Sequence, residues 1–445
     1  MTIAAIATPN ASGGVGIVRI SGKDSAKILD GLFYGKSVSE MESRKMYLGN
    51  VGINGEVLDK ALVCMFRAPA SYTGEDTAEI HCHGGLTVCR AVLDAAISLG
   101  ARPALPGEFT KRAFLNGKMD LSQAEAVADL INAETRKQVT VAASQLDKSL
   151  GGEISALRGK ILDAAGHLLA TMDFSEEGVE PLEYDELLEI LKSAKEKTDR
   201  LILSSESGRI IKDGVNTAII GAPNAGKSSL LNAILGEDRA IVTDIKGTTR
   251  DVLETSVNIR GCKLNLFDTA GIRESDDRIE KMGIDRSLKT LKNADLILFV
   301  ADGAKGITEE EQEIISMLDK KKTVLVINKT DLPQKELDAG GFSHTVYVSA
   351  KNSHGLDKLY EIIEEKYNVT DIKEKEVITN PRHRECLLRA NSLINGAISE
   401  ITGGVPFDIV LSGIELAISA LGEISGETVS EEIVDNIFSK FCVGK

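Results

Sequence analysis

The pattern of apolar and polar positions divides the chain into segments of different character. From residue 1 to about 118, short runs of β-branched residues such as 16–20 and 77–80 are separated by glycines. Runs of this kind, bounded by glycine, are typical of strands. We therefore predict an α+β domain over residues 1–118.

Apolar residues then recur at helical spacing. Steps of i+3 and i+4, which place apolar side chains on one face of a helix, begin after Asp120 and return after Ile378. We predict a helical domain in two parts, 119–213 and 371–445. The spacings Ser122/Glu125 and Thr428/Glu431 predict capping boxes at two of its helix starts.

Between the two helical parts, strand-like and helical stretches alternate. The runs 217–220 and 264–267 are apolar and of strand length, and helical stretches lie between such runs up to about residue 370. Strands interleaved with helices form parallel sheets. The pattern predicts a doubly wound α/β domain, 214–370, inserted into the helical domain, and insertion at an exposed connection is well tolerated.

Composition narrows the class of protein. The 445 residues include 52 Lys and Arg and 67 Asp and Glu, so the net charge of −15 argues against a surface that is basic throughout, although a local basic patch stays open. The chain contains no Trp and only 4% aromatic residues, which argues against the aromatic surface on which many single-strand nucleic-acid binders stack bases. The six cysteines show no paired spacing, which fits a reducing compartment. The sequence shows neither the pattern of a secretory signal nor an apolar run of the ~18 to 20 residues that span a bilayer. We therefore predict a cytoplasmic protein.

A phosphate-binding motif opens the inserted domain. Residues 221–228 read GAPNAGKS, which fits G-x-x-x-x-G-K-[ST], and they lie between an apolar strand and a helix-like run. In such a loop, backbone N–H groups converge on the phosphates, Lys227 neutralises the β and γ phosphates, and Ser228 binds Mg²⁺. The alternative is a glycine-rich turn without a ligand.

Three further motifs weaken that alternative, because each follows an apolar strand: 268–271 (DTAG), 328–331 (NKTD) and 349–351 (SAK). Asp268 is placed to hold the water shell of Mg²⁺ and Gly271 to donate to the γ-phosphate. Asp331 accepts two hydrogen bonds from guanine that adenine cannot donate, which favours GTP over ATP. Thr249 lies where a switch threonine is expected and is a second Mg²⁺ ligand.

The predicted GTP-binding residues are those of the four motifs and of the switch segment: Asn224, Ala225, Gly226, Lys227, Ser228, Ser229, Thr243, Asp244, Ile245, Lys246, Gly247, Thr248, Thr249, Asp268, Thr269, Ala270, Gly271, Asn328, Lys329, Asp331, Ser349, Ala350 and Lys351. Ile272 follows DTAG where many small GTPases carry a glutamine that orients the attacking water. Hydrolysis therefore needs another group, either an acidic residue of 273–280 or a cation in the place of an arginine finger. The plain alternative for that charged run is a solvated loop.

Two other clusters have structural explanations beside the functional ones. His81-Cys82-His83 suggests a metal, but on a strand the histidines face one side and the cysteine the other, and no second ligand pair lies nearby. The basic segment 102–118 suits an anionic ligand or RNA phosphates, with a solvated loop as the alternative.

Three segments carry a resemblance to a known family: 2–9 (TIAAIATP) with 16–22, then 102–118 (RPALPGEFTKRAFLNGK), and 438–445 (FSKFCVGK). With them, the chain resembles over essentially its whole length the tRNA uridine-modification GTPases often called the MnmE or TrmE family. The resemblance implies an N-terminal domain that binds a reduced folate, 5-formyl- or methylene-tetrahydrofolate, and forms a homodimer. It also implies a flavin-dependent partner subunit, a heterotetramer with it, and installation of an aminomethyl or carboxymethylaminomethyl group at carbon 5 of the tRNA wobble uridine.

The resemblance also implies roles for individual residues. The folate pocket matches Arg19, Glu79, Lys118 and Lys445, and the potassium site matches Asn224, Thr243, Ile245 and Thr248. The same comparison makes Glu280 the water-orienting residue and Cys442 a thiol of the modification chemistry, with a buried helix-end cysteine as the alternative. A K⁺ ion at the phosphates would supply the charge that arginine fingers supply elsewhere.

Two rival functions stay open. A ribosome-assembly GTPase would act as a switch without chemistry on RNA, although no GXXG-bearing KH pattern is present. A folate-dependent one-carbon transferase would use GTP as a regulator.

Overall fold

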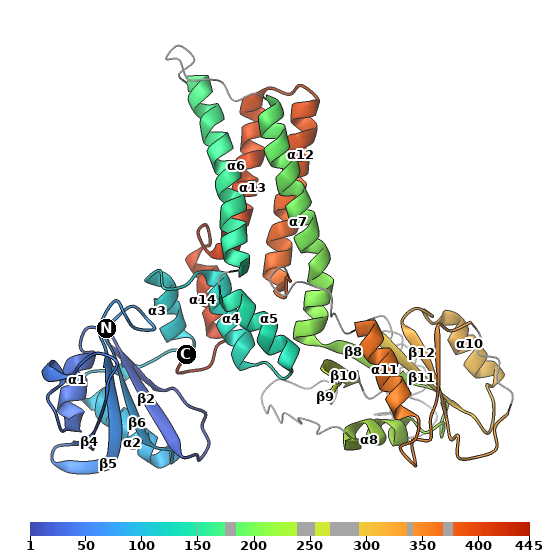
Figure 1. The fold of residues 1–445 in the computed structure, drawn as a ribbon, viewed down its shortest axis with the longest axis horizontal. Helices are drawn as coiled ribbons and strands as arrows, with labels where there is room; N and C mark the ends of the chain where they lie inside the picture. Colours follow the sequence, from blue (N-terminus) through green and yellow to red (C-terminus); the bar gives the residue numbers. More distant parts are fainter. Residues whose placement is uncertain (148, 174–183, 238–253, 268–292, 336–340, 368–376) are drawn as a thin grey trace, which may run out of the picture. The chain divides into compact units, whose positions relative to one another are not determined.

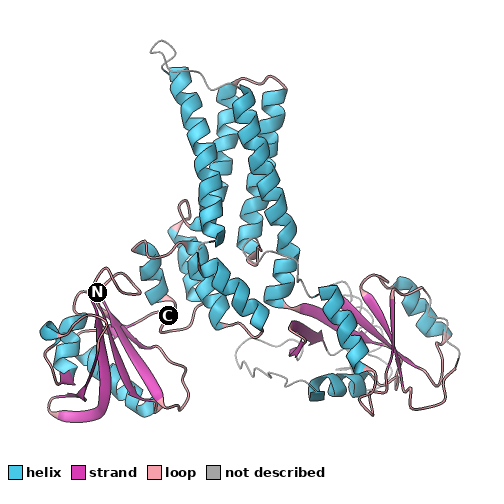
Figure 2. Ribbon diagram, in the orientation of Figure 1, coloured by secondary structure: helices cyan, strands magenta, loops and turns pink. Residues whose placement is uncertain are grey.

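The structure, a computed structural model, describes residues 1–147, 149–173, 184–237, 254–267, 293–335, 341–367 and 377–445. It divides into two compact units, one of residues 1–131, 143–198 and 386–445, the other of residues 132–142 and 199–385. Figure 2 shows the strands gathered into two sheets, with long helices in other parts of the chain. Among the described residues, none of the helices has both the length and the apolar character needed to span a bilayer.

The first unit contains a seven-stranded sheet with the order β3-β4-β5-β6-β2-β1-β7. Neighbouring strands are antiparallel except β1 and β7, which are parallel. The strands are β1 (Ile3–Ile6), β2 (Val15–Ser21), β3 (Phe33–Tyr34), β4 (Met46–Ile53), β5 (Glu56–Phe66), β6 (Thr77–His83) and β7 (Arg102–Pro103).

One face of this sheet is buried. Helices α1 (Ser25–Leu32) and α2 (Leu86–Ser98) share a core with Val18, Ile20 and Ile80, and the short 3₁₀ helix η1 (Val38–Glu40) joins it. Because side chains alternate along a strand, Arg19 and Glu79 lie on the opposite face. The α+β character expected for residues 1–118 is confirmed.

The helices of the first unit form two groups. A short group consists of α3 (Glu108–Leu115), α4 (Leu121–Ile131) and α14 (Glu431–Ser439), whose aromatic and aliphatic side chains meet around Phe438. A long group consists of α6 (Ser149–Asp173), α13 (Phe407–Ser425), the part of α7 (Tyr184–Asp213) up to residue 198 and the part of α12 (Pro381–Thr402) from residue 386, which run side by side in Figure 1. Polar pairs join them, among them Asn391 to Thr198 at 2.8 Å and Arg389 to Glu423.

Both predicted capping boxes are wrong. Helix α4 begins at Leu121, and the reciprocal bonds join Asp120 and Gln123: the Gln123 N–H donates to Asp120 Oδ1 at 2.8 Å and the Asp120 N–H to Gln123 Oε1 at 3.0 Å. Ser122 donates to Asp120 instead. Helix α14 begins at Glu431, and the hydroxyl of Thr428 donates to the Ser419 carbonyl.

The second unit contains a six-stranded sheet with the order β13-β12-β11-β8-β10-β9, in which only β9 is antiparallel to its neighbour. The strands are β8 (Val215–Ile220), β9 (Glu254–Ile259), β10 (Cys262–Phe267), β11 (Leu296–Asp302), β12 (Thr323–Asn328) and β13 (His344–Tyr347). Helices α8 (Lys227–Glu237), α10 (Glu309–Met317) and α11 (Leu356–Tyr367) pack on this sheet. Helix α5 (Arg136–Leu146) has residues in both units.

This second sheet confirms the predicted doubly wound, mostly parallel fold. β11 and β12 are buried at every position, as strands covered on both faces should be. The compact unit is larger than the predicted insertion, because it also includes residues 132–142, 199–213 and 377–385. The boundaries 214 and 370 therefore stay a prediction.

Candidate functional sites

The phosphate-binding loop joins β8 to α8 as the motif requires. Lys227 is the first residue of α8, and its ammonium donates to the carbonyl oxygens of Gly221 and Ala222, both at 2.8 Å. Asn224 and Gly226 have positive φ values of 63° and 97°. A Cβ atom on Gly226 would lie 2.1 Å from Nδ2 of Asn328, so glycine is required where the next motif approaches the loop.

Asn328, the last residue of β12, joins two of the predicted motifs. Its Nδ2 donates to the Ala225 carbonyl at 3.0 Å, and its Oδ1 accepts from the Ala350 N–H at 3.0 Å. The side chain is buried, and so are both of its partners. Asn328 therefore holds the phosphate-binding loop and the 349–351 loop in a fixed relation to each other.

Asp302 is a residue of the site that the sequence reasoning missed. It is the last residue of β11, is buried, and accepts from the Lys329 ammonium at 2.7 Å, while the same ammonium donates to the Asn224 carbonyl at 2.7 Å. Burial acts to raise the pKa of Asp302, but hydrogen bonds from Lys329 and the Ala304 N–H, with the charge of Lys329, outweigh burial and lower it. The same rule that located the other motifs, a polar residue at the end of an apolar strand, would have found Asp302.

Asp331 and Ser349 face each other as expected for a guanine site. The Ser349 hydroxyl donates to Asp331 Oδ1 at 2.7 Å, and this hydrogen bond is the main cause that lowers the pKa of the carboxyl group. The carboxylate is therefore ionised near neutral pH and retains a second oxygen for a ligand. Asp331 itself is exposed, whereas Ser349 is buried.

Some of the predicted nucleotide and metal residues are described and others are not. Ser228, Ser229 and Lys351 lie exposed at the start of α8 and in the 349–351 loop. The remaining predictions fall outside the described residues: Thr243, Asp244, Ile245, Lys246, Gly247, Thr248, Thr249, Asp268, Thr269, Ala270, Gly271 and Glu280. Their roles stay predictions.

A second polar cluster lies on the other face of the first sheet, which α3 and the end of the described chain partly cover. Arg19 and Glu79 are directly opposite on β2 and β6, and Arg19 Nε donates to Glu79 Oε1 at 2.9 Å. The Arg19 guanidinium also lies 5.5 Å from the ring centre of Tyr72 and 5.7 Å from that of Phe109. These distances are within the range of cation–π attraction, which helps to hold the guanidinium in place.

The end of the described chain returns to this cluster. The Phe109 N–H donates to the Lys445 carbonyl at 3.2 Å, and the Gly107 N–H to the Cys442 carbonyl at 3.3 Å. Burial and the charge of Arg19 lower the pKa of Lys445, while Glu79 opposes them. Gly444 has a φ of 99°, and a Cβ atom there would lie 2.3 Å from the Ile6 carbonyl oxygen, so the tail packs closely on β1.

The structure thus brings together three of the four residues of the predicted folate pocket. Lys118 is exposed, and its ammonium donates to the Pro69 carbonyl at 3.1 Å. Cys442 is also exposed, which removes the buried-cysteine alternative. His81 and His83 pair with Glu79 and Asp59, whereas Cys82 points into the core, where burial raises the pKa of its thiol to about 12.

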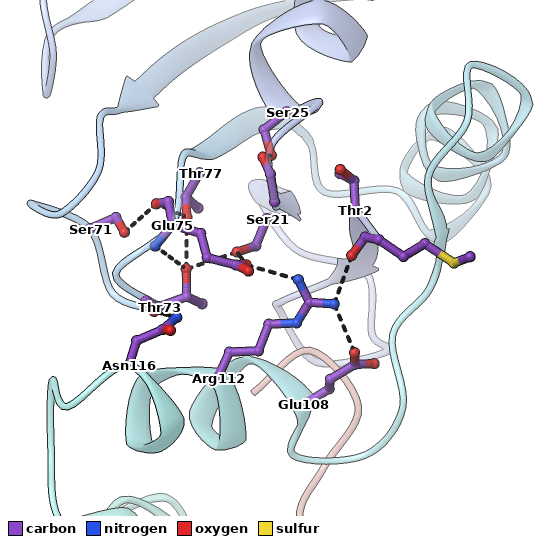
Figure 3. A network of polar contacts seen from close by, with 12 residues as sticks. Thr2, Ser21, Ser25, Ser71, Thr73, Glu75, Thr77, Glu108, Arg112 and Asn116 are labelled. Carbon is purple, nitrogen blue, oxygen red and sulfur yellow. Dashed lines mark hydrogen bonds and ion pairs between the residues drawn. The ribbon is translucent and has the colours of Figure 1, made fainter.

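The basic segment 102–118 is largely neutralised within the protein. Arg112 donates to Glu75 at 2.8 Å and to Glu108 at 3.0 Å, as Figure 3 shows. It also donates to the Met1 carbonyl at 2.9 Å. Arg102 pairs with Glu108, and Lys111 pairs with Asp435. Arg102 and Arg112 therefore join α3 to the sheet and the segments beside it, whereas Lys111 joins α3 to α14.

Comparisons with known proteins cover the whole chain. One family model, described as the N-terminus of the GTP-binding protein TrmE, matches residues 2–118, and another, the MnmE helical domain, matches residues 121–442. A "tRNA modification GTPase MnmE" of Thermoanaerobacter pseudethanolicus is 44% identical over 461 aligned residues, covering 100% of this chain and 99% of that protein. One of Clostridioides difficile is 43% identical over 454 residues with the same coverage.

Among solved structures, the G domain of the T. maritima FeoB iron transporter is 30% identical and covers 34% of this chain and 98% of that one, with a TM-score of 0.25. The evidence for the family lies in the two family models and in the full-length relatives, together with the nucleotide-binding geometry above. The chain belongs to the MnmE family of tRNA modification GTPases.

Proposed function

We propose that this protein is a potassium-stimulated GTPase of the cytoplasm that couples GTP hydrolysis to folate-dependent modification of tRNA. It acts as a homodimer with a flavoprotein partner and installs an aminomethyl or carboxymethylaminomethyl group at carbon 5 of the wobble uridine. The observation that carries the nucleotide half is the convergence of Asn224, in the loop after β8, with Lys329, Asn328 and Asp331 at the end of β12, although β11 lies between these two strands. Family membership supports the tRNA half.

The residues of the phosphate-binding loop suit a nucleotide with its metal ions. Ser228 is exposed at the N-terminus of α8, where a hydroxyl is available to Mg²⁺, and we assign Thr249 as the second ligand. Asn224 is exposed beside it, and we assign it to K⁺ together with Thr243, Ile245 and Thr248. The cations would neutralise charge on the phosphates. Lys227 binds phosphate oxygens in place of the two loop carbonyls, and Glu280 orients the attacking water.

The cluster on the first sheet suits a reduced folate. A folate has a heteroaromatic ring with N–H donors and a carboxylate tail, and the cluster offers Glu79 as acceptor and Arg19 and Lys445 as cations. Tyr72 supplies partly exposed apolar surface beside them, and the fully buried Phe109 packs against the Arg19 guanidinium. Lys118 is assigned to the tail of the same ligand and Cys442 to the uridine chemistry. A bound folate would supply the one-carbon unit.

The test is GTP hydrolysis by the full chain in K⁺ and in Na⁺ buffers of equal ionic strength. We expect K⁺ to accelerate the wild type, and Asn224→Ala and Glu280→Ala to abolish that gain. Asn395→Ala is the matched control, because Asn395 is an exposed asparagine on α12 of the first unit. Equal rates in both salts would contradict the potassium site and favour a ribosome-assembly switch.

A second assay tests the tRNA half. Purified chain is mixed with its flavoprotein partner, 5-formyl- or methylene-tetrahydrofolate, GTP and unmodified tRNA, and the wobble nucleoside is identified by mass spectrometry. Modification that persists when GDP replaces GTP would point instead to a one-carbon transferase that GTP merely regulates.

A further inference from the structure

His81 lies next to the proposed folate-binding cluster of Arg19, Glu79 and Lys445, but it has no role in the function proposed so far. It lies on β6 two positions after Glu79, and therefore on the same face of the sheet. Its Nε2 lies 3.2 Å from Glu79 Oε2, while Arg19 Nε lies 2.9 Å from the other oxygen, Oε1. Each oxygen of the carboxylate is therefore held by a different side chain.

Holding both oxygens fixes the direction of the remaining lone pairs. A glutamate side chain has three rotatable bonds, and ordering such a side chain at the moment of binding weakens the affinity for the ligand. The Arg19 bond alone leaves Glu79 free to turn about the bonded oxygen. The second bond from His81 removes that freedom before a ligand arrives.

The neighbours of this pair explain why His81 is the residue that does this. Across the sheet, Ile17 on β2 and Leu62 on β5 lie opposite His81, so neither offers Glu79 a hydrogen bond. Cys64 on β5 lies opposite Glu79, and burial with the charge of Glu79 raises the pKa of its thiol. The thiol therefore stays neutral and places no second negative charge beside the carboxylate.

We propose that His81 is a positioning residue of the ligand site. By donating from Nε2 to Glu79, it holds the carboxylate so that its free lone pairs accept the adjacent N–H donors of the folate ring. Because an ionised Glu79 cannot donate, this role requires the proton on Nε2 of the imidazole. The inference rests on the proposed function, in which Glu79 binds the folate.

The experiment compares three variants of the full chain: His81→Leu, which removes the donor; His81→Gln, whose Nε2 amide can replace it; and His83→Leu. His83 is the matched control, since it lies on the same face of the same strand and pairs with a different carboxylate, Asp59, at 2.7 Å. The dissociation constant of 5-formyltetrahydrofolate is measured by calorimetry. GTP hydrolysis and thermal unfolding verify that each variant is folded.

We expect His81→Leu to weaken binding at least tenfold, about 1.4 kcal/mol, while His81→Gln and His83→Leu stay within threefold of the wild type. Binding by His81→Leu equal to the wild type, or by His81→Gln as weak as by His81→Leu, would overturn the inference alone. Absence of binding by the wild type would overturn the folate half of the proposed function and the inference with it.

Discussion

Replacing Asn328 by alanine should weaken nucleotide binding, because this side chain holds two loops of the nucleotide site together. The side chain joins the buried Ala225 carbonyl to the buried Ala350 N–H, and Asn328 itself is 2% exposed. Alanine leaves both backbone groups without a partner, at about 1 to 3 kcal/mol each. The total cost is therefore about 2 to 6 kcal/mol.

This cost divides between stability and binding. Part lowers the free energy of unfolding of the second unit, and part appears when the nucleotide has to bring the two separated loops back together. We expect about 2 kcal/mol in binding, an increase of roughly 30-fold in the dissociation constant of GDP. Titration with a fluorescent GDP analogue measures the second part, and urea unfolding measures the first.

Asn265→Ala is the control for this experiment. Asn265 lies on β10 of the same sheet, and its Nδ2 donates to the Asp213 carbonyl at 2.7 Å, away from the nucleotide motifs. It should lose some stability and keep its affinity for GDP. An Asn328→Ala variant that binds GDP within threefold of the wild type would refute the claim that this amide holds the two loops together.

Three other substitutions test separate features. Asp302→Asn should lower the free energy of unfolding at pH 7 by about 1 kcal/mol, a value reduced because Lys329 is partly exposed. The pKa of Asp302 is lowered in the folded state. The stability that its carboxylate contributes is therefore present above the ordinary carboxyl pKa of about 3.9 and is lost as the pH falls through the folded-state pKa. The difference between variant and wild type in urea unfolding should accordingly shrink toward acid pH. Gly444→Ala places a Cβ 2.3 Å from a β1 carbonyl and should displace Lys445, weakening 5-formyltetrahydrofolate binding at least tenfold without changing GTP hydrolysis; unchanged binding would contradict the close packing of the tail. Asp331→Asn should bind xanthosine triphosphate in preference to GTP in a competition titration, because the asparagine amide donates a hydrogen bond where xanthine has a carbonyl. A variant that still prefers GTP would show that Asp331 does not bind the base.

The nucleotide site was predictable because its parts are local. Strand, loop and helix are contiguous around residues 221–228, and the rule that polar residues follow apolar strands located Asn328 and Asp331. The bond from Lys329 to the Asn224 carbonyl joins two loops 105 positions apart, and no local pattern indicates which partner a lysine selects.

The helix starts show the opposite case. Ser122/Glu125 fits the capping spacing, but so does Asp120/Gln123 two positions earlier, and the geometry of the chain entering α4 decides between them. The cluster around Arg19 was expected only from the family resemblance. Its assembly depends on the tail returning to Phe109, a long-range contact that spacing along the sequence does not encode.

That return has a consequence for the order of events during synthesis. Lys111 pairs with Asp435, 324 positions later in the chain, and the segment after Asp435 supplies Lys445 to the first sheet. A ribosome produces about 5 to 20 residues per second, so the sheet is complete for roughly 15 seconds or more before its last cation is made. The strands of the N-terminal domain are therefore all synthesised before Lys445, the residue that completes the proposed folate pocket. In the proposed function, translation itself delays folate capture until the GTPase domain and the helical bundle have been made.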